Sequence, residues 1–287
     1  MKKGLALLLI LGLLISVLVM TGCGDGSSPD NMGVTLIEPA DSSHPKLVAS
    51  AKDGLAKLES ELLISTDTVN CGRKDLAKII DKAVGKSKYV VIVGFEVDDV
   101  IESAANYPDN KFIVVESTCT QVANHTNVLC VEYDNREIEF LSGYIAGKIC
   151  EQDVICISSE LSENVCNGLS QGIEYADPGI GADRTAHSDG KNIFMDSSGK
   201  VLAADGKTLF SIDIDVGTCI YDIVKLDLEE GMWSGGSTWE VDISSGYMSL
   251  VFPEEREELY KSLKRDIEKV TSQIISGEIR IKSVDED

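Results

Sequence analysis

Residues 74–117 of the chain read KDLAKIIDKAVGKSKYVVIVGFEVDDVIESAANYPDNKFIVVES, and the rest of the fold can be argued outward from them. Two apolar runs rich in β-branched residues, 89–94 and 112–116, alternate with two segments of helical periodicity, 74–84 and 97–106. Runs without polar interruption are typical of strands that a parallel sheet buries on both faces. The stretch therefore predicts consecutive βαβ units.

The same alternation continues on both sides of this stretch. We expect strands at 32–37, 63–69, 128–133 and 154–158, and helices at 46–62, 136–151 and 163–176. The regular pattern stops at 177–207, where three pairs ending in Gly separate short apolar runs. Such pairs are turn signals, so this segment is expected to be a β-meander.

The last third of the chain returns to regular elements. We expect strands at 209–214, 239–243 and 247–252, and helices at 218–228 and 253–275. The final helix begins with Pro253 and ends at Gly277, residues that favour helix starts and stops respectively. Its apolar residues form one stripe: Leu259, Leu263, Ile267, Val270 and Ile274.

The N-terminus carries an export signal. Lys2 and Lys3 precede an apolar run from Leu5 to Met20, which is too short to span a bilayer comfortably. The small residues before Cys23 resemble the lipobox of bacterial lipoproteins, so residues 1–22 are predicted to be a signal peptide and Cys23 the lipidated residue. An uncleaved membrane anchor with a chance cysteine is the alternative. In either case the folded part lies outside the cytoplasmic membrane.

Composition excludes several classes of protein. The chain has 287 residues, 43% of them hydrophobic, which indicates a folded globular protein. Its formal net charge of -22 argues against nucleic acid as a partner. With 3 His and no closely spaced cysteine pair, we expect no metal site and no cofactor. No nucleophile elbow or phosphate loop is present, so we do not expect an enzyme.

The chain has 8 Cys, several of them in apolar runs where they are expected to act as small buried hydrophobes. Disulfides are compatible with an extracytoplasmic compartment, but the sequence does not indicate a pairing.

Five segments of the chain, the opening stretch among them, carry a family resemblance. These are residues 74–117, REIEFLSGYIAGKI at 136–149, NGLSQGIEYADP at 167–178, VGTCIYDIVK with EEGMWSGG within 216–236, and PEEREELYKSLKRDIEKVTSQIISGEI at 253–279. In this order they resemble lipoproteins of the basic membrane protein family, which includes purine nucleoside receptors. The resemblance implies a periplasmic-binding-protein-like α/β fold, with a parallel sheet flanked by helices in each of two lobes.

The resemblance and the export signal together divide the chain. Residues 1–22 are the expected signal peptide, 23–31 a flexible tether and 32–135 the first α/β lobe. Residues 136–252 are the expected second lobe, shortened and incomplete, with the β-meander inside it, and 253–287 are the C-terminal helix and tail.

The resemblance also implies ligand positions in the first lobe. The family's loop after the first strand carries an Asp followed by Phe-Asn; here Asp41 matches, while His44 and Pro45 replace the pair. Asp41 fits a helix cap or a turn equally well. Gly94 and Phe95 follow the strongest strand at its carboxyl end, where open α/β sheets bind ligands.

Two acids complete the set of candidates. Glu116 ends a buried strand and matches an Asp that in the family reaches the ribose hydroxyls, although an ordinary surface Glu is the alternative. Asp196 is the counterpart of a second-lobe Asp, but it fits a hairpin turn better. The family's sugar-binding Lys has no counterpart in 211–215, so the cleft is expected to be rich in carboxylates and short of donors.

These observations favour a solute-binding lipoprotein. We expect a protein anchored by lipid to the outer face of the cell membrane, which binds a small-molecule solute, with a nucleoside as the suspected ligand, and delivers it to an ABC permease. The alternative is a degenerate surface lipoprotein that binds no solute and acts through contacts with other proteins.

Overall fold

The computed structural model describes residues 32–41, 45–115 and 121–284. Met32–Asp287 form one compact unit, which contains two six-stranded sheets. The expected signal peptide, the tether and Cys23 lie outside the described residues. In the described part of the chain, no helix combines the length and the apolar character that crossing a bilayer requires.

The first sheet is parallel throughout. Its strands run in the order β11 (Ser237–Val241), β5 (Val128–Tyr133), β4 (Lys111–Val115), β3 (Ser87–Val93), β1 (Gly33–Pro39) and β2 (Thr66–Cys71). The uninterrupted apolar runs in β3 and β4 are fully buried, as expected of central strands of a parallel sheet. The predicted α/β class with a parallel sheet flanked by helices is confirmed.

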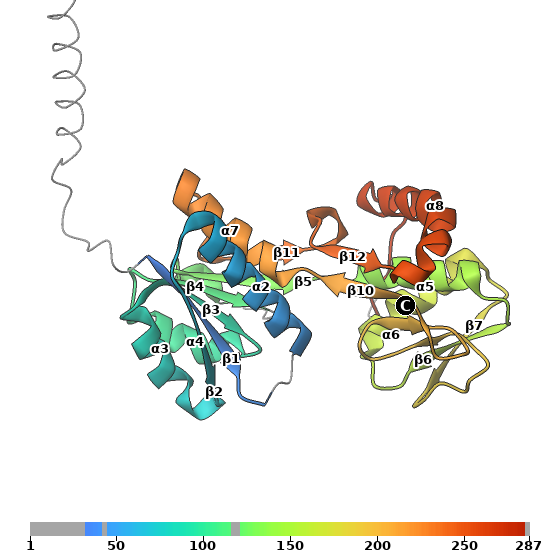
Figure 1. Ribbon diagram of the computed structural model, residues 1–287, viewed down its shortest axis with the longest axis horizontal. Helices are drawn as coiled ribbons and strands as arrows, with labels where there is room; N and C mark the ends of the chain where they lie inside the picture. The colour runs from blue at the N-terminus through green and yellow to red at the C-terminus, as the bar shows by residue number, and fades with distance from the viewer. Residues whose placement is uncertain (1–31, 42–44, 116–120, 285–287) are drawn as a thin grey trace, which may run out of the picture. The chain divides into compact units, whose positions relative to one another are not determined.

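Helices cover both faces of this sheet (Figure 1). On one face lie α2 (Pro45–Leu62) and α7 (Val216–Glu230), whose apolar residues share a cluster with Val34 and Leu36 of β1. On the other face lie α3 (Leu76–Val84), preceded by the turn η2 (Arg73–Asp75), and α4 (Val97–Ala104). Successive strand residues point to opposite faces, so each helix pair buries alternate residues of the same strands.

The second sheet is mixed. Its order is β12 (Met248–Val251), β10 (Thr208–Ile214), β9 (Lys200–Leu202), β8 (Phe194–Met195), β6 (Val154–Ser158) and β7 (Gly181–Thr185). Its helices are α5 (Arg136–Ile149), α6 (Glu163–Ala176) and α8 (Glu257–Ile275), with the short 3-10 turns η4 (Ile243–Ser245) and η5 (Glu254–Arg256) nearby in the sequence. A further 3-10 turn, η3 (Val122–Asn124), lies between β4 and β5 of the first sheet.

The irregular segment 177–207 is only partly a meander. Strands β8, β9 and β10 are antiparallel neighbours, with Gly199 and Gly206 at the turns in left-handed conformation (φ 75° and 79°). Strand β7 instead pairs parallel to β6, because α6 carries the chain back along the sheet as in a βαβ unit.

The sheet topology divides residues 136–252 between the two sheets. Helix α7 packs on α2 of the first sheet, and β11 adds to that sheet beside β5, with Trp239 opposite Val131. The sequence led us to expect that residues 136–252 form one contiguous second lobe, whereas α7 and β11 belong with the first sheet. Hydrophobic periodicity identifies a helix or a strand, but it does not indicate which sheet that element joins.

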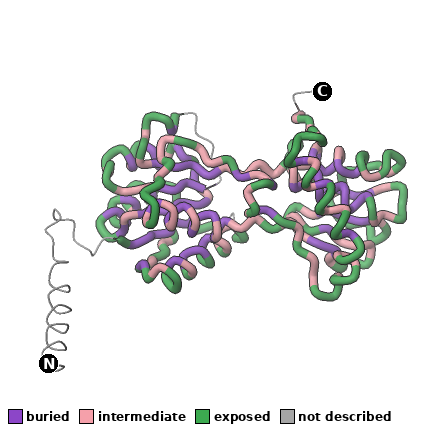
Figure 2. The backbone as a smooth tube through the Cα atoms, turned by 90° about the horizontal axis from the view of Figure 1, so that it is seen from above, coloured by how far each residue is buried: buried purple, intermediate pink, exposed green. Residues whose placement is uncertain are grey.

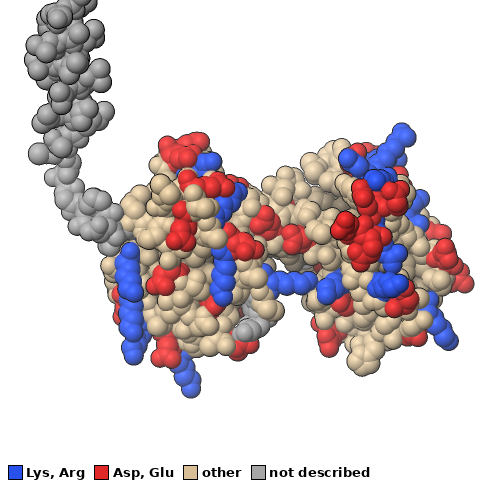
Figure 3. Space-filling model, viewed as in Figure 1, with Lys and Arg blue, Asp and Glu red and all other residues tan. Residues whose placement is uncertain are grey.

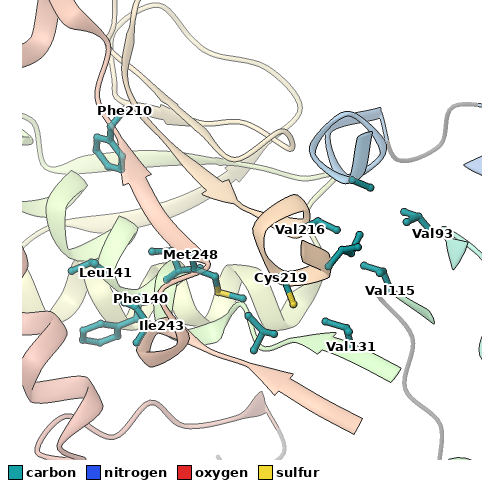
Figure 4. Packing of buried hydrophobic residues seen from close by; sticks show 14 of the residues in the cluster. Val93, Val115, Val131, Phe140, Leu141, Phe210, Val216, Cys219, Ile243 and Met248 are labelled. Atoms are coloured by element: carbon teal, nitrogen blue, oxygen red, sulfur yellow. The ribbon is translucent and has the colours of Figure 1, made fainter. Parts of the chain in front are cut away.

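One apolar cluster connects the two sheets. It runs from Val93, Val115 and Val131 at the ends of first-sheet strands, through Val216 and Cys219 of α7, to buried side chains of the second sheet and its helices: Phe140, Leu141, Phe210, Ile243 and Met248 (Figure 4). Figure 2 shows buried residues in the interior of both parts of the molecule, with exposed residues around them. The stripe of α8 joins the same cluster, with Leu263, Val270 and Ile274 buried.

No disulfide links the cysteines of the described residues. Cys71, Cys156, Cys166 and Cys219 are buried, in agreement with their expected role as small apolar residues, and Cys150 is half-buried. Burial raises the pKa of the Cys219 thiol to about 12, so it stays protonated.

Candidate functional site

A cavity with a volume of about 880 Å³ lies among the described residues. We call it the large cavity. It is lined by the first half of α2, the starts of α5, α6 and α7, the turn between β8 and β9, and the end of β10. Elements of both sheets therefore contribute to its walls.

The close contact between α2 and α7 sets one wall of the large cavity. A Cβ atom on Gly54 would lie 2.3 Å from the carbonyl oxygen of Gly217, so only glycine permits the two backbones to approach this closely. Across the contact, the Gly217 N–H donates to Ser50 Oγ at 3.0 Å. This places Ser50 and the start of α7 side by side at the cavity.

The turn between β8 and β9 forms a second wall. Asp196 Oδ1 accepts hydrogen bonds from the N–H groups of Ser198 and Lys200 and from the Ser198 hydroxyl. Lys46 Nζ, on α2, donates to the Ser198 carbonyl oxygen. Asp196 thus lines the large cavity, and its Oδ1 is engaged in the hairpin turn that the sequence favoured for this residue.

A third wall is one face of α5. Asn135, Glu139 and Ser142 are spaced four and three residues apart, which brings them onto the same face of the helix. Burial raises the pKa of the Glu139 carboxyl group from 4.5 to about 8. Sequence reasoning missed these residues, because polar side chains at helical spacing usually indicate a solvated face.

Among the charged side chains that line the large cavity, carboxyl groups outnumber lysines, so hydrogen-bond acceptors are more abundant than donors. Two of its three lysines already have partners: Lys46 has the Ser198 carbonyl, and Lys57 Nζ lies 4.1 Å from the centre of the Tyr221 ring. Asp53 and Asp213 are exposed at its lining, and Asp215 caps α7 by accepting from Thr218 N–H at 2.8 Å. Figure 3 shows acidic side chains distributed over both parts of the surface in view.

A second, smaller pocket of about 280 Å³ lies at the carboxyl ends of β1, β2 and β3. We call it the small pocket. Asp41, Gly94 and Phe95 line it, so the structure brings these three predicted residues together. Gly94 has a left-handed backbone (φ 75°), which turns the chain sharply after β3, and Phe95 is buried in the core beneath. Arg73 Nε and Asp99 Oδ2 form an ion pair of 2.8 Å at its rim.

The remaining predicted residues are distributed differently. His44 and Glu116 lie outside the described residues. Asp196 lies at the large cavity and not at the small pocket. Asp41 at the small pocket and Lys46 at the large cavity are five positions apart in the sequence, so the chain at the start of α2 connects the two. The described residues contain no group of three or more His, Cys, Asp or Glu side chains arranged to bind a metal ion.

Comparison with known proteins gives a family. A family model described as ABC transporter substrate-binding protein PnrA-like matches residues 40–183. Basic membrane protein D of Borreliella burgdorferi (strain JD1) is 20% identical, and the alignment covers 81% of this chain and 82% of that protein. Basic membrane protein A of strain B31 of the same species is 23% identical, with coverage of 96% and 95%.

Solved structures with the same fold include an ABC transporter solute-binding protein from Conexibacter woesei. It has a TM-score of 0.66 and 15% identity, covering 88% of this chain and 99% of that chain. A solute-binding protein from Aeropyrum pernix has a TM-score of 0.64 and 16% identity, covering 88% and 93%. At this level of identity the likeness shows the fold alone.

Proposed function

The chain belongs to the PnrA-like family of ABC transporter substrate-binding proteins, and on this premise we propose that it is a lipid-anchored, extracytoplasmic receptor for a nucleoside-type solute. In this proposal the receptor delivers its solute to the permease of an ABC importer. It performs no chemistry on the solute.

The large cavity is the observation that carries the proposal. Small-molecule sites are concave, have volumes of roughly 300–1,000 Å³ and combine apolar walls with a few polar groups. The large cavity, at about 880 Å³, has this size, whereas the small pocket, at about 280 Å³, is near the lower limit. Leu47, Leu169 and Met195 supply apolar surface beside the polar groups of α5.

We assign the predicted residues to two parts of one solute site. Asp196 belongs to the large cavity, and Asp41, Gly94 and Phe95 to its extension at the small pocket. We propose that His44 and Glu116 complete the site. His44 directly precedes α2 in the sequence and Glu116 directly follows β4, and the Glu116 carboxylate would accept hydrogen bonds from solute hydroxyls.

A thermal-shift screen of residues 30–287 against nucleosides and free bases tests the proposal. A solute present at roughly 100 times its Kd stabilises the folded state by about 2.7 kcal/mol, which is readily measured. Stabilisation by a nucleoside supports the receptor. If no solute stabilises the protein, the second candidate is favoured, which is a lipoprotein that acts through contacts with other proteins. The lysines of the large cavity that already have partners, Lys46 and Lys57, are consistent with a cavity that binds no solute. Permease and ATPase genes beside this gene would favour the receptor.

Anchoring is tested separately. We expect Cys23→Ser to release the protein from the membrane fraction, because the thiol that carries the lipid is lost. Ser27→Ala, in the same tether, is the matched control and should leave the protein in the membrane fraction. Mass spectrometry that found an intact Met1 and no acyl chain on the native protein would contradict the lipid anchor.

A further inference from the structure

Two polar atoms on the cavity face of α5 lack hydrogen-bond partners among the described residues. They are Asn135 Oδ1 and Ser142 Oγ, both shielded from solvent, and the whole Ser142 residue is only 1% exposed. The carboxyl group of Glu139, between them on the same face, likewise has no hydrogen-bond or ion-pair partner among the described residues. A buried polar atom without a partner is unfavourable, so such atoms in a cavity wall indicate that something else binds there.

These three side chains lie beside a close contact between α5 and α6. Glycines make this contact: Cβ atoms on Gly143 and Gly172 would lie 2.1 Å and 2.0 Å from carbonyl oxygens of the facing helix. All three side chains line the large cavity next to this contact.

The face offers three oxygen acceptors to a bound molecule: the amide oxygen of Asn135, the carbonyl oxygen of the Glu139 carboxyl group and the hydroxyl oxygen of Ser142. The amide nitrogen of Asn135 and the hydroxyl protons of Ser142 and of protonated Glu139 are the donors on the same face. Beside them, Leu161, Val165 and Leu169 form an apolar wall from the α6 side. An acceptor row next to an apolar wall suits a flat ring that presents N–H groups along one edge.

We propose that Asn135, Glu139 and Ser142 form the subsite that accepts the N–H donors of the bound solute, with its ring against the α6 wall. This inference rests on the proposed solute-binding function, and it specifies which edge of the solute forms hydrogen bonds with these three side chains. In a purine nucleoside this is the edge that carries the ring N–H and any amino group. Solutes that lack those donors leave the three acceptors unpaired and bind weakly.

Titration calorimetry with three ligands tests this on residues 30–287. Guanosine has a ring N–H and an amino group on this edge, inosine has the ring N–H alone, and 1-methylinosine has neither. We expect affinity to fall at each step, by about fivefold when the donor to Glu139 is lost, which is the effect of one hydrogen bond to a neutral group. Equal affinity for guanosine and 1-methylinosine would overturn the inference and leave the receptor function intact.

Variants separate recognition from folding. Glu139→Ala and Ser142→Ala each remove one acceptor and are expected to weaken guanosine binding by about fivefold and about threefold respectively, and to leave 1-methylinosine unchanged. Glu163→Ala, at an exposed residue on α6 outside the cavity lining, is the matched control and should change nothing. An equal loss for all three ligands in Glu139→Ala would indicate a structural role and overturn the inference. Failure of the unmodified protein to bind any of the three would overturn the proposed function together with it.

Discussion

Glu139 couples the stability of the fold to pH. Its pKa is about 8 in the folded protein against 4.5 for an ordinary Glu, because burial disfavours the charged form. Its stabilising effect is therefore complete below about pH 4.5 and is lost as the pH rises through about 8. The full shift corresponds to a free energy of about 5 kcal/mol.

Glu139→Gln removes this titration while it preserves the shape of the side chain. We expect the variant to match the unmodified protein at about pH 4 and to have the larger free energy of unfolding at about pH 9. Denaturant unfolding at both pH values measures this, with Glu163→Gln as the control. A stability difference that did not change between the two pH values would contradict the raised pKa.

Asp227 is the centre of a buried polar cluster at the other end of α7. Lys111 Nζ lies 2.6 Å from Asp227 Oδ1, the Tyr89 hydroxyl donates to Asp227 Oδ2, and the Asp227 side chain is only 5% exposed. Burial and the neighbouring Asp227 carboxylate both raise the pKa of the Tyr89 hydroxyl group, which therefore stays protonated and remains a hydrogen-bond donor. Lys111 also lies 5.1 Å from the centre of the Trp233 ring.

Asp227→Asn should lower the free energy of unfolding by about 3 kcal/mol, because it leaves the Lys111 ammonium partly buried without its counter-charge. The control is Asp205→Asn, which removes the partner of exposed Lys207 and should have no measurable effect on the denaturation midpoint. Similar midpoints for the two variants would show that the buried cluster contributes no more than a surface ion pair.

At the scale of elements, glycines fix how α5 and α6 pack. A Cβ atom on Gly172 would lie 2.0 Å from the Phe140 carbonyl oxygen, so the backbone of α5 or α6 would have to move to make room for it. We expect Gly172→Ala to lower the free energy of unfolding by about 2–3 kcal/mol through this overpacking. Thermal and denaturant unfolding provide the measurement.

Gly85→Ala is the matched control for this change. The nearest neighbour of a Cβ atom there is 3.7 Å away and its φ is −70°, so the added methyl group should be neutral or stabilise by about 0.5 kcal/mol. If Gly172→Ala were as stable as Gly85→Ala, the helices would have to be further apart than the structure places them.

The elements that the sequence predicted well are those with unambiguous periodicity. The apolar run at 89–94 corresponds to β3, and the segment 163–176 is α6 from end to end. The strand expected at 63–69 begins instead at Thr66, because Leu63 takes a left-handed conformation (φ 55°) and is 87% exposed in the turn after α2. Two apolar residues in a turn resemble the start of a strand when only hydrophobicity is considered.

At the scale of the whole molecule, the pairing of strands that are far apart in the sequence could not be predicted. Nothing in residues 237–241 indicates that they lie beside 128–133, about a hundred positions earlier, because pairing leaves no periodic signal. The positions of Asp41, Gly94 and Phe95 at one sheet edge were predictable, since the ends of neighbouring parallel strands meet there. The large cavity was not, because it depends on how α2, α5 and α7 come together.

Solute binding in the large cavity can be measured by calorimetric titration of guanosine into residues 30–287, combined with a variant that blocks the cavity. Asp53→Trp places a bulky ring at the cavity lining from an exposed position on α2, so the fold should be retained. We expect binding at one site per chain that Asp53→Trp abolishes, while Glu102→Trp, exposed on α4 and outside the cavity lining, preserves it. Guanosine binding of equal strength in all three proteins, or no binding in the unmodified chain, would contradict solute binding in the large cavity.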